Sequence, residues 1–463
     1  MFLPVNKRYK GTLTDISQII ESAIDKIDYV TEVKCMIYVI ADDLSGANDT
    51  GVQFTKKGYS TIVSVLDERS TIMIPDNLDV FVMDTETREL ESKTVRKRLK
   101  SILEKININK KDLVYKKVDS TLRGNVGVEI EVIMNILKKD ICIFNSSLPS
   151  QQRMTVRGYL IVDQKPLGLS EYSSNHLEQG ENSFIPFLLK KQTDFPVGQI
   201  DLKDVTKGQE TILSKINELS QKGNKIIVID STNEEHLKDI FASGLKLDRP
   251  VLFSGSAGLA NHFPNTYSKK EDLKIKIEDN KGPVIVVAGS RNSILEDQVN
   301  YIKNRLNFTE LKIDLEQVFS DKDRILDNYA AEGIKAIKGN HDLVIHTAAT
   351  YNEEKSINKK LMLKYHLSFR ELEIKIKTFL GELISKIIKN SDVRNLILTG
   401  GDTALGVCKE LGISNFNVID ELLPGIPLAI ANCKNYNLNI VTKAGGFGKE
   451  DILYDLISKL KKY

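Results

Sequence analysis

The chain has 463 residues, of which 41% are hydrophobic and 28% are charged, proportions typical of a folded globular protein. They argue against a disordered, collagen-like or membrane protein. The 65 Lys and Arg nearly balance the 63 Asp and Glu, and this formal net charge of +2 argues against broad binding of nucleic acid. A chain of this length predicts two or three domains.

The first predicted element is a helix over residues 14–30, where isoleucine and alanine recur at helical spacing. We expect residues 1–34 to form an N-terminal helical extension. Its apolar face would pack on the first domain or on a neighbouring subunit, so a homodimer is one of the two expectations.

Short apolar runs alternate with helical patterns between residues 35 and 260. A helix is predicted from Asn48, and a second, amphipathic helix is predicted from Val95 to Ile106. The predicted strands are residues 36–40, 80–84, 113–118, 140–145, 226–230 and 251–253. This alternation is typical of a parallel sheet covered by helices on both faces.

A second series of the same kind follows residue 282. Its predicted strands are residues 284–288, 343–346, 396–399 and 438–441. Between the two series, residues 261–282 are polar and contain a proline, as linkers between domains do. The predicted fold class is therefore α/β with two domains, residues 35–260 and 283–463, each a largely parallel sheet flanked by helices.

The four cysteines are far apart and form no CxxC pair, so neither a zinc knuckle nor a disulfide framework is predicted. They are Cys35, Cys142, Cys408 and Cys433. The first ten residues lack the apolar segment of a signal peptide, and no apolar run approaches the roughly 20 residues that span a bilayer. We expect a cytoplasmic protein that has no membrane partner.

Polar side chains gather where the predicted strands end, which is where parallel sheets bind ligands. Residues 41–51, ADDLSGANDTG, follow the first strand and hold three acidic residues and two glycines. The adjacent carboxylates of Asp42 and Asp43 suit sugar hydroxyls, a metal or a catalytic base. Helix capping explains one or two of these residues, so the sequence favours a functional site here.

Arg88 directly follows the second strand, where it is placed to bind a carboxylate with two hydrogen bonds or to pair with Glu86 or Glu89. Lys116 and Lys117 end the next strand, and alternation sends them to opposite faces of the sheet.

A polar cradle for an anionic, hydroxylated small molecule is predicted from four residues close together in the sequence. They are Lys117, Asp119, Ser120 and Arg123. The alternative is a simple capped turn, with Ser120 or Thr121 as the helix N-cap. Arg153 and Arg157 add basic groups after the following strand.

The second half of the chain has a different pattern, with Gly, Ser and Thr at strand-to-helix junctions. The segments are residues 254–260, 288–293, 398–407 and 442–451. Glycine lets the backbone approach a ligand, and helix N-termini present free N–H groups to phosphate. None of the segments matches the Walker or the full GxGxxG pattern. Together they favour a nucleotide site of another kind.

The six histidines show no metal-ligand spacing, and no GxSxG motif is present. Neither a zinc site nor a Ser-His-Asp hydrolase is therefore predicted.

Eight segments together resemble the four-carbon acid sugar kinase family, and they occur in the order typical of it. They are ADDLSGANDTG (41–51), DTETR (84–88), KKVDSTLRGN (116–125), SGSAGLA (254–260), VAGSRN (287–292), LTGGDTA (398–404), LPGIP (423–427) and TKAGGFGKED (442–451). The resemblance covers most of the chain from residue 36 onward, and the first and third segments are specific to the family. The N-terminal extension departs from the family's compact form.

The resemblance implies ATP-dependent phosphorylation of the terminal hydroxyl of threonate, erythronate or a 3-oxo-tetronate. It also implies that the N-terminal domain binds the sugar acid, that the C-terminal domain binds ATP, and that the active site lies in an interdomain cleft. Mg²⁺ would accompany the phosphates.

The site residues carried over from the motifs fall into two groups. The expected sugar-acid ligands are Asp42, Asp43, Arg88, Lys117, Asp119, Ser120 and Arg123. The expected ATP contacts are Ser254, Ser256, Gly400, Gly401, Asp402, Thr403, Gly445 and Gly446. Asp402 and Lys443 are further candidates to face the phosphates or the metal, but no metal ligand is assigned.

The mechanistic hypothesis is in-line transfer of the γ-phosphoryl group across the closing cleft. Asp43 or Asp42 would accept the hydroxyl proton, and Arg88 and Arg123 would bind the substrate carboxylate. Two alternatives stay open: a hydrolase or ligase acting on a sugar phosphate, and a regulatory protein that binds nucleotide and sugar acid without turnover.

Overall fold

A computed structural model of the chain describes residues 35–170, 183–264, 282–289, 293–303, 305–347, 351–433 and 436–463. The helix predicted at residues 14–30 and most of the predicted linker, 261–282, lie outside the described residues. Residues from Met36 to Tyr463 form one compact unit.

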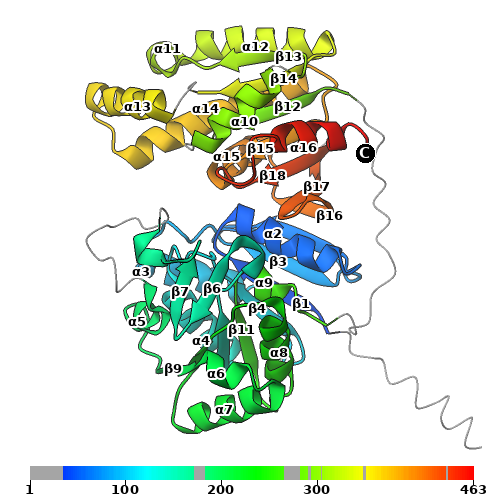
Figure 1. Cartoon of the computed structure of the whole chain (residues 1–463). Coiled ribbons are helices and arrows are strands. Elements are labelled where there is room, and N and C mark those ends of the chain that lie inside the picture. Colours follow the sequence, from blue (N-terminus) through cyan, green and yellow to red (C-terminus); the bar gives the residue numbers. More distant parts are fainter. Residues whose placement is uncertain are drawn as a thin grey trace, which may run out of the picture. The chain divides into compact units, whose positions relative to one another are not determined.

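The first half of that unit is built from parallel strands and the helices that connect them (Figure 1). Its strands are β1 (Ile37–Ala41), β2 (Thr61–Val65), β3 (Val80–Asp84), β4 (Leu113–Lys117), β5 (Ile141–Asn145), β9 (Val197–Ile200), β10 (Ile226–Ile229) and β11 (Val251–Gly255). Its helices are α2 (Leu44–Thr55), α3 (Ser92–Leu103), α4 (Val126–Leu137), α5 (Ile185–Lys190), α6 (Leu202–Val205), α7 (Gln209–Gln221), α8 (Glu234–Leu245) and α9 (Ala257–Ala260). A separate small antiparallel sheet contains β6 (Arg153–Val156), β7 (Tyr159–Val162) and β8 (Lys165–Pro166).

The second half repeats this scheme and adds an antiparallel section. Its strands are β12 (Val284–Ala288), β13 (Phe308–Lys312), β14 (Asp342–His346), β15 (Asn395–Thr399), β16 (Asn415–Leu423), β17 (Ile426–Cys433) and β18 (Tyr436–Lys443). Its helices are α10 (Ser293–Lys303), α11 (Leu315–Ser320), α12 (Lys322–Lys338), α13 (Tyr351–Tyr365), α14 (Phe369–Lys389), α15 (Gly401–Leu411) and α16 (Ile452–Leu460).

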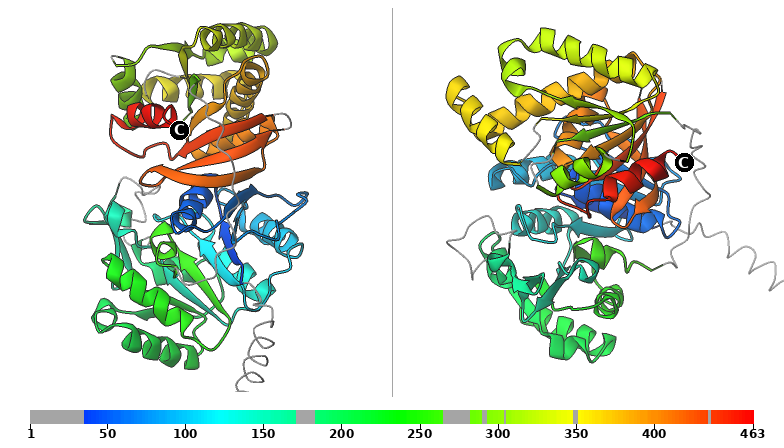
Figure 2. Two further views of the ribbon diagram at one scale, coloured as in Figure 1. Left: turned by 90° about the vertical axis from the view of Figure 1, so that its right-hand side faces the viewer. Right: turned by 45° about the horizontal axis from the view of Figure 1, so that its top comes forward.

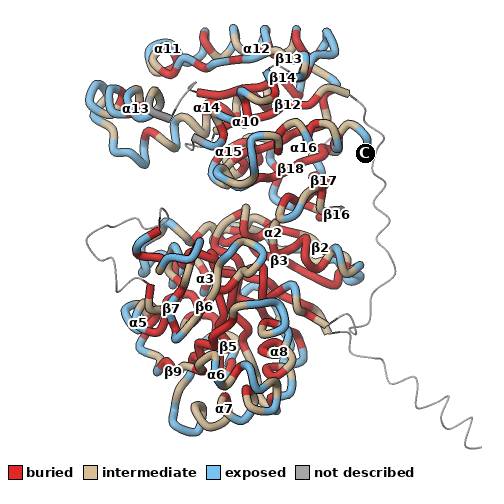
Figure 3. Tube along the Cα trace, viewed as in Figure 1, coloured by how far each residue is buried: buried red, intermediate tan, exposed pale blue. Residues whose placement is uncertain are grey.

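The two faces of each parallel sheet carry separate hydrophobic cores, because successive side chains of a strand point to opposite faces. On β1, Val39 packs toward α2, whereas Ile40 packs toward α3 and α4. On β12, Val286 packs toward α10 and α16, and Val287 packs toward α12 and α14. The strands are accordingly buried, and exposed residues concentrate on the outer sides of the helices (Figure 3).

The halves share one continuous fifteen-stranded sheet instead of the separate sheets expected from the sequence. β16 and β17 form a hairpin whose turn contains Gly425 at φ +76°, and Figure 2 shows these long strands beside β18. β16 also pairs antiparallel with β2, from Asn415 opposite Ser64 to Val418 opposite Thr61. The pairing arises because β2 and β16 would otherwise be edges with unpaired backbone groups.

The strands predicted from apolar runs are confirmed, with β3 and β12 matching their predicted limits. The predicted start of the first described helix was wrong: α2 begins at Leu44 and not at Asn48. The Asp43 carboxylate accepts a hydrogen bond from the Gly46 backbone N–H, and this cap starts the helix earlier. Ile106 lies beyond the end of α3, although it is buried as its spacing predicted.

Candidate active site

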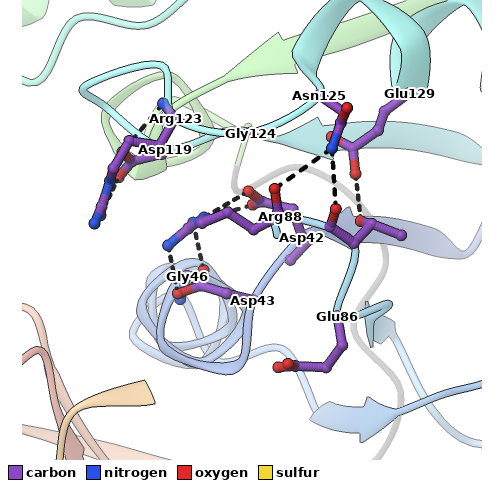
Figure 4. Close-up of polar contacts among 12 residues, drawn as sticks. Asp42, Asp43, Gly46, Glu86, Arg88, Asp119, Arg123, Gly124, Asn125 and Glu129 are labelled. Atoms are coloured by element: carbon purple, nitrogen blue, oxygen red, sulfur yellow. Dashed lines mark hydrogen bonds and ion pairs between the residues drawn. The ribbon is translucent and has the colours of Figure 1, made fainter. Parts of the chain in front are cut away.

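Arg88 joins the two adjacent carboxylates that follow β1 (Figure 4). Its Nε lies 2.8 Å from Oδ2 of Asp42, and its Nη1 lies 2.7 Å from Oδ2 of Asp43. Its Nη2 donates to both residues, at 3.2 Å and 2.7 Å. The loop after β3 therefore reaches back to the loop after β1, and Arg88 pairs with neither Glu86 nor Glu89.

The two carboxylates of this fork differ electrostatically. Burial alone would raise the pKa of Asp42, but Arg88, Lys116 and Lys117 together lower it below its ordinary value. Burial raises the pKa of Asp43 despite the opposing charge of Arg88. Asp42 is therefore held ionised, whereas Asp43 takes up a proton more readily.

Lys116 and Lys117 point to opposite faces of the sheet, as alternation predicted. The Lys116 Nζ lies 3.0 Å from Oε2 of Glu129 on α4, and both side chains are buried. Lys117 lies on the side of α2, where its Nζ is 2.9 Å from the position that a Cβ on Gly46 would take. Glycine at position 46 thus makes room for a buried ammonium group beside Asp43.

The rest of the predicted cradle, Asp119, Ser120 and Arg123, forms three further contacts. Arg123 Nε lies 2.6 Å from Oδ2 of Asp119, and Thr121 Oγ1 donates to the same carboxylate. Burial would raise the pKa of Asp119, but Arg123 and its hydrogen bonds hold it well below its usual range. Arg153 from β6 hydrogen-bonds Ser120. No helix begins at Ser120 or Thr121, so the capped-turn alternative is wrong.

A carboxyl pair at the end of β3 was missed as a functional feature of the DTETR segment. Asp84 is fully buried, and its carboxyl group interacts with that of Glu86. Burial raises the pKa of Glu86 to about 7 and raises that of Asp84 well above its ordinary value. The sequence signal was two acidic residues, separated only by Thr85, at a strand end.

The glycines after β15 lie beside the carboxylates of the first half. Gly400 has φ +90°, and α15 begins at Gly401. A Cβ on Gly401 would lie 2.8 Å from Ser45 Oγ and 3.6 Å from Oδ2 of Asp43. Two helix N-termini, those of α2 and α15, therefore meet at this point.

Asp402 and Thr403, which were also predicted to contact ATP, lie in the first turn of α15. Asp402 is exposed and pairs with Lys377 of α14 at 2.6 Å. Thr403 is buried, and a Cβ on Gly289 would lie 2.1 Å from its Oγ1, so only glycine fits there. The remainder of the 288–293 segment lies largely outside the described residues.

The loop after β18 is held by Lys443, which is 1% exposed. Its Nζ donates to the carbonyl oxygens of Ala444, Gly445 and Phe447 at 2.9 to 3.1 Å. The ammonium group is therefore directed at its own loop, while Gly446 is exposed at the tip.

Ser254 lies near the end of β11, which is placed between β4 and β5, and Ser256 directly follows this strand. Ser254 is in register with Lys116, and both serines are buried. Ser256 Oγ caps α9 by accepting the Gly258 N–H, and it donates to the Ser147 carbonyl at 2.6 Å. The structure thus groups these serines with the strands of the first half rather than with Gly400 and Gly401.

No group of three or more His, Cys, Asp or Glu side chains among the described residues is arranged to hold a metal ion. His346, which ends β14, lies 2.7 Å from Glu310. The part of the chain that is described also contains no helix long and apolar enough to cross a membrane.

Comparison with known proteins identifies two family domains. Residues 37–263 match the model of a sugar-binding N-terminal domain, and residues 285–453 match that of a nucleotide-binding C-terminal domain.

Characterised relatives align over nearly the whole chain. A D-threonate kinase of Salmonella typhimurium is 30% identical, with 90% of this chain and 97% of the relative covered. A D-erythronate kinase of Heliobacterium modesticaldum is 24% identical over 90% and 94% of the two chains. A 3-oxo-tetronate kinase of Pseudomonas savastanoi pv. phaseolicola is also 24% identical, over 91% and 96%.

Solved structures show the same fold. A crystal structure of a Salmonella typhimurium protein superposes with a TM-score of 0.74 at 22% identity, covering 91% of this chain and 98% of that one. A Haemophilus influenzae protein gives a TM-score of 0.69 at 21% identity, covering 92% and 99%.

Proposed function

This chain belongs to the four-carbon acid sugar kinase family and is a kinase of four-carbon sugar acids, and we propose that ATP is its phosphoryl donor and the terminal hydroxyl its acceptor. The family and the enzyme class expected from the sequence motifs are thereby confirmed. The candidate substrates are threonate, erythronate and 3-oxo-tetronate.

The observation that carries the proposal is the close approach of Gly401 to Ser45 and Asp43. It brings the first turn of α15, in the nucleotide-binding domain, against the first turn of α2, in the sugar-binding domain. Phosphoryl transfer depends mainly on positioning a donor next to an acceptor. We propose that the active-site cleft lies at this junction.

We propose that the sugar acid binds in the charged cradle of the first domain, which from here on also includes Asp42, Asp43 and Arg88. The Arg88 fork orients Asp42 and Asp43 to accept hydrogen bonds from sugar hydroxyls, and the Lys117 ammonium supplies positive charge. Asp119 fixes Arg123, whose side chain stays 59% exposed and can therefore reach a substrate carboxylate. Because the donors of Arg88 are directed at two aspartates, Arg123 is better placed for that contact, and Ser120 would add a hydroxyl group to the cradle.

We propose that ATP phosphates bind the N-terminus of α15. Gly400 has no side chain with which to cap this helix, which leaves first-turn N–H groups of Gly401, Asp402 and Thr403 to donate to an anion. Gly445 and Gly446 would approach from the neighbouring loop. The contacts assigned to Ser254 and Ser256 remain a prediction.

Mg²⁺ would neutralise charge on the phosphates during transfer. Because no preformed group of metal-binding side chains exists among the described residues, we propose that the ion binds chiefly through ATP oxygens and water. Proton acceptance by Asp43 or Asp42 is still a prediction. The cytoplasmic location, the homodimer and the domain limits of 35–260 and 283–463 are also predictions.

The test is ADP release from ATP, measured with a coupled assay across a panel of four-carbon acids. The matched controls are threitol and erythritol, which keep the hydroxyls but lack the carboxylate. ADP formation with an acid, together with one equivalent of phospho-acid, supports the kinase. ATP binding without ADP release for every acid would favour a regulatory protein. Product formed without stoichiometric ADP and phospho-acid would favour the hydrolase or ligase acting on a sugar phosphate.

A further inference from the structure

Glu86 has a left-handed backbone conformation, with φ +48°, in the turn after β3. Residues other than glycine hold such conformations only where the surroundings impose them, and these often occur at functional sites. Here Arg98 on α3 donates to the carbonyl oxygens of Thr85 and Glu86 at 3.3 Å and 3.1 Å. The Glu86 N–H donates to Oδ1 of Asp84 at 3.1 Å. The turn therefore fixes the direction in which the Glu86 side chain leaves the backbone.

The Glu86 carboxylate lies at the N-terminus of α2, where it accepts the backbone N–H of Leu44. Figure 4 shows this side chain pointing away from the Arg88 guanidinium. Arg88 forms its hydrogen bonds with Asp42 and Asp43, and Arg98 forms an ion pair with Glu68 at 3.2 Å. Within the described part of the chain, no basic side chain forms an ion pair with Glu86.

Acidic groups face Glu86 from three elements instead. Asp84 of β3 lies behind it, and no N–H or O–H group of the described residues donates to Oδ2 of Asp84. Asp43 at the start of α2 and Asp402 on α15 add negative charge. Burial, together with the charges of Asp43 and Asp402, raises the pKa of Glu86 to about 7, although its hydrogen bonds with the Asp84 carboxyl group and the Leu44 N–H act to lower it.

The position of Glu86 matters as much as its charge. Asp43 belongs to the sugar-acid cradle, and Asp402 belongs to the first turn of the helix proposed to bind the ATP phosphates. Glu86 interacts electrostatically with both. Under the proposed function, Glu86 lies at the N-terminus of α2, near the junction at which the acceptor hydroxyl would approach the γ-phosphate.

We propose that Glu86 is the proton acceptor of the phosphoryl transfer, an inference that rests on the proposed kinase function. The O–H bond of the substrate hydroxyl breaks and its proton passes to a Glu86 carboxylate oxygen. The hydroxyl oxygen forms a bond to the γ-phosphorus, and the bond from that phosphorus to the β–γ bridging oxygen breaks, which releases ADP. Glu86 then returns the proton to water. Asp84 is a positioning residue that acts through Glu86.

Asp42 and Asp43 are weaker candidates for this step. Both are bound to Arg88, and Asp43 also caps α2 through the Gly46 N–H. Although burial acts to raise it, Arg88 and the two neighbouring lysines lower the pKa of Asp42, which makes Asp42 a weak base. Burial raises the pKa of Asp43, but both of its carboxylate oxygens accept hydrogen bonds from Arg88, so a proton taken up there would compete with the guanidinium. Their expected effect is therefore on substrate binding rather than on proton transfer.

The test compares E86Q with E89Q, a matched change at an exposed glutamate three residues along the same loop. We expect E86Q to lower kcat by about 100-fold or more while binding of ATP and of the sugar acid, measured by calorimetry, changes less than threefold. In the wild type, kcat should rise with pH through a midpoint near 7, and E86Q should lose this limb. E89Q should match the wild type. E86A should recover part of its activity with added formate.

Several results would overturn the proposal while leaving the kinase function intact. They are an E86Q enzyme with unchanged kcat, an E86Q enzyme that is slower but keeps the same pH limb, and loss of that limb in D43N instead. If circular dichroism shows that E86Q does not fold, E86D is measured instead. A wild-type kcat in E86D together with a shifted midpoint of the pH profile supports the proposal. An unshifted midpoint contradicts it. If the wild type releases no ADP with any four-carbon acid, the proposed function fails and this inference fails with it.

Discussion

Asn48 on α2 donates a hydrogen bond from its side-chain amide to Oγ1 of Thr442 on β18, across 3.1 Å, and both residues are buried. The bond joins the sugar-binding domain to the nucleotide-binding domain. α2 begins beside Asp43, and β18 leads directly into the loop held by Lys443. This hydrogen bond therefore helps to fix the position of α2, which begins beside Asp43, relative to β18, which leads into the Lys443 loop.

Replacing Thr442 with valine should lower the free energy of unfolding by about 1–3 kcal/mol. Valine keeps the shape of threonine but leaves the buried Asn48 amide without its acceptor. Urea denaturation measures the change, and Thr442→Ser, which retains the hydroxyl, is the control. A T442V protein as stable as T442S would show that the hydrogen bond contributes nothing.

The parallel strands could be predicted because their residues are apolar on both faces. β12, with the sequence VIVVA, is buried along its whole length, and its limits were predicted correctly. β16 alternates polar and apolar residues and is only partly buried, so its sequence gave a weaker strand signal than that of β12. The LPGIP motif that follows was not recognised as a hairpin turn. The join between the two sheets pairs Asn415 with Ser64, some 350 positions away, and no local pattern encodes such a pairing.

Much of the candidate site could also be predicted from the residues that come directly after the predicted strands. Asp42, Asp43 and Arg88 were each predicted because they directly follow a strand, and the parallel sheet does bring them together. The sequence did not predict which charged side chains form ion pairs with each other. Glu86 was considered only as one of two alternative partners of Arg88, beside Glu89, and only the three-dimensional structure shows that Arg88 is directed at the two aspartates.

Alanine at Gly46 should impair the cradle, because its Cβ would lie 2.6 Å from Oδ1 of Asp43 and 2.9 Å from Nζ of Lys117. We expect kcat/KM for the sugar acid to fall about tenfold or more, while the KM for ATP stays within about threefold, since only the cradle is disturbed.

Gly51→Ala is the matched control on the same helix, where the closest atom, Val63 Cγ2, would be 3.2 Å away. Both changes raise helix propensity by a similar amount. Steady-state kinetics and thermal melting of the two variants separate the local effect from a general one. Equal losses of kcat/KM in both would contradict the placement of Lys117 and Asp43 in the substrate site.

Glu129→Gln should be among the most destabilising single changes in the first domain. It removes the carboxylate charge that lies 3.0 Å from the buried Lys116 Nζ, and breaking a buried ion pair in this way costs about 3–5 kcal/mol. The control is Glu131→Gln on the same helix, which faces the partly exposed Arg96 and should cost about 1 kcal/mol or less. Urea unfolding of both variants measures the difference, and similar losses would show that the Lys116–Glu129 ion pair contributes little to stability.

Lys443→Met should weaken ATP binding, because the loop at Gly445 would lose the ammonium group that collects three of its carbonyl oxygens. We expect the KM for ATP to rise several-fold with little change in the KM for the sugar acid. Lys449→Met, an exposed lysine of the same loop, should leave both constants unchanged. An unaltered KM for ATP in K443M would remove this loop from the nucleotide site.

The burial of Lys443 should also make the free energy of unfolding depend on pH. Burial lowers the pKa of Lys443 from 10.5 to about 7, so between these values the unfolded chain binds more protons than the folded chain. The unfolding free energy of the wild type, taken relative to K443M, should therefore rise as the pH increases from about 7 to about 10. Melting temperatures of the two proteins across that range measure it, since all other groups titrate alike in both. A difference that stays constant with pH would mean that the three carbonyl oxygens keep Lys443 charged despite its burial.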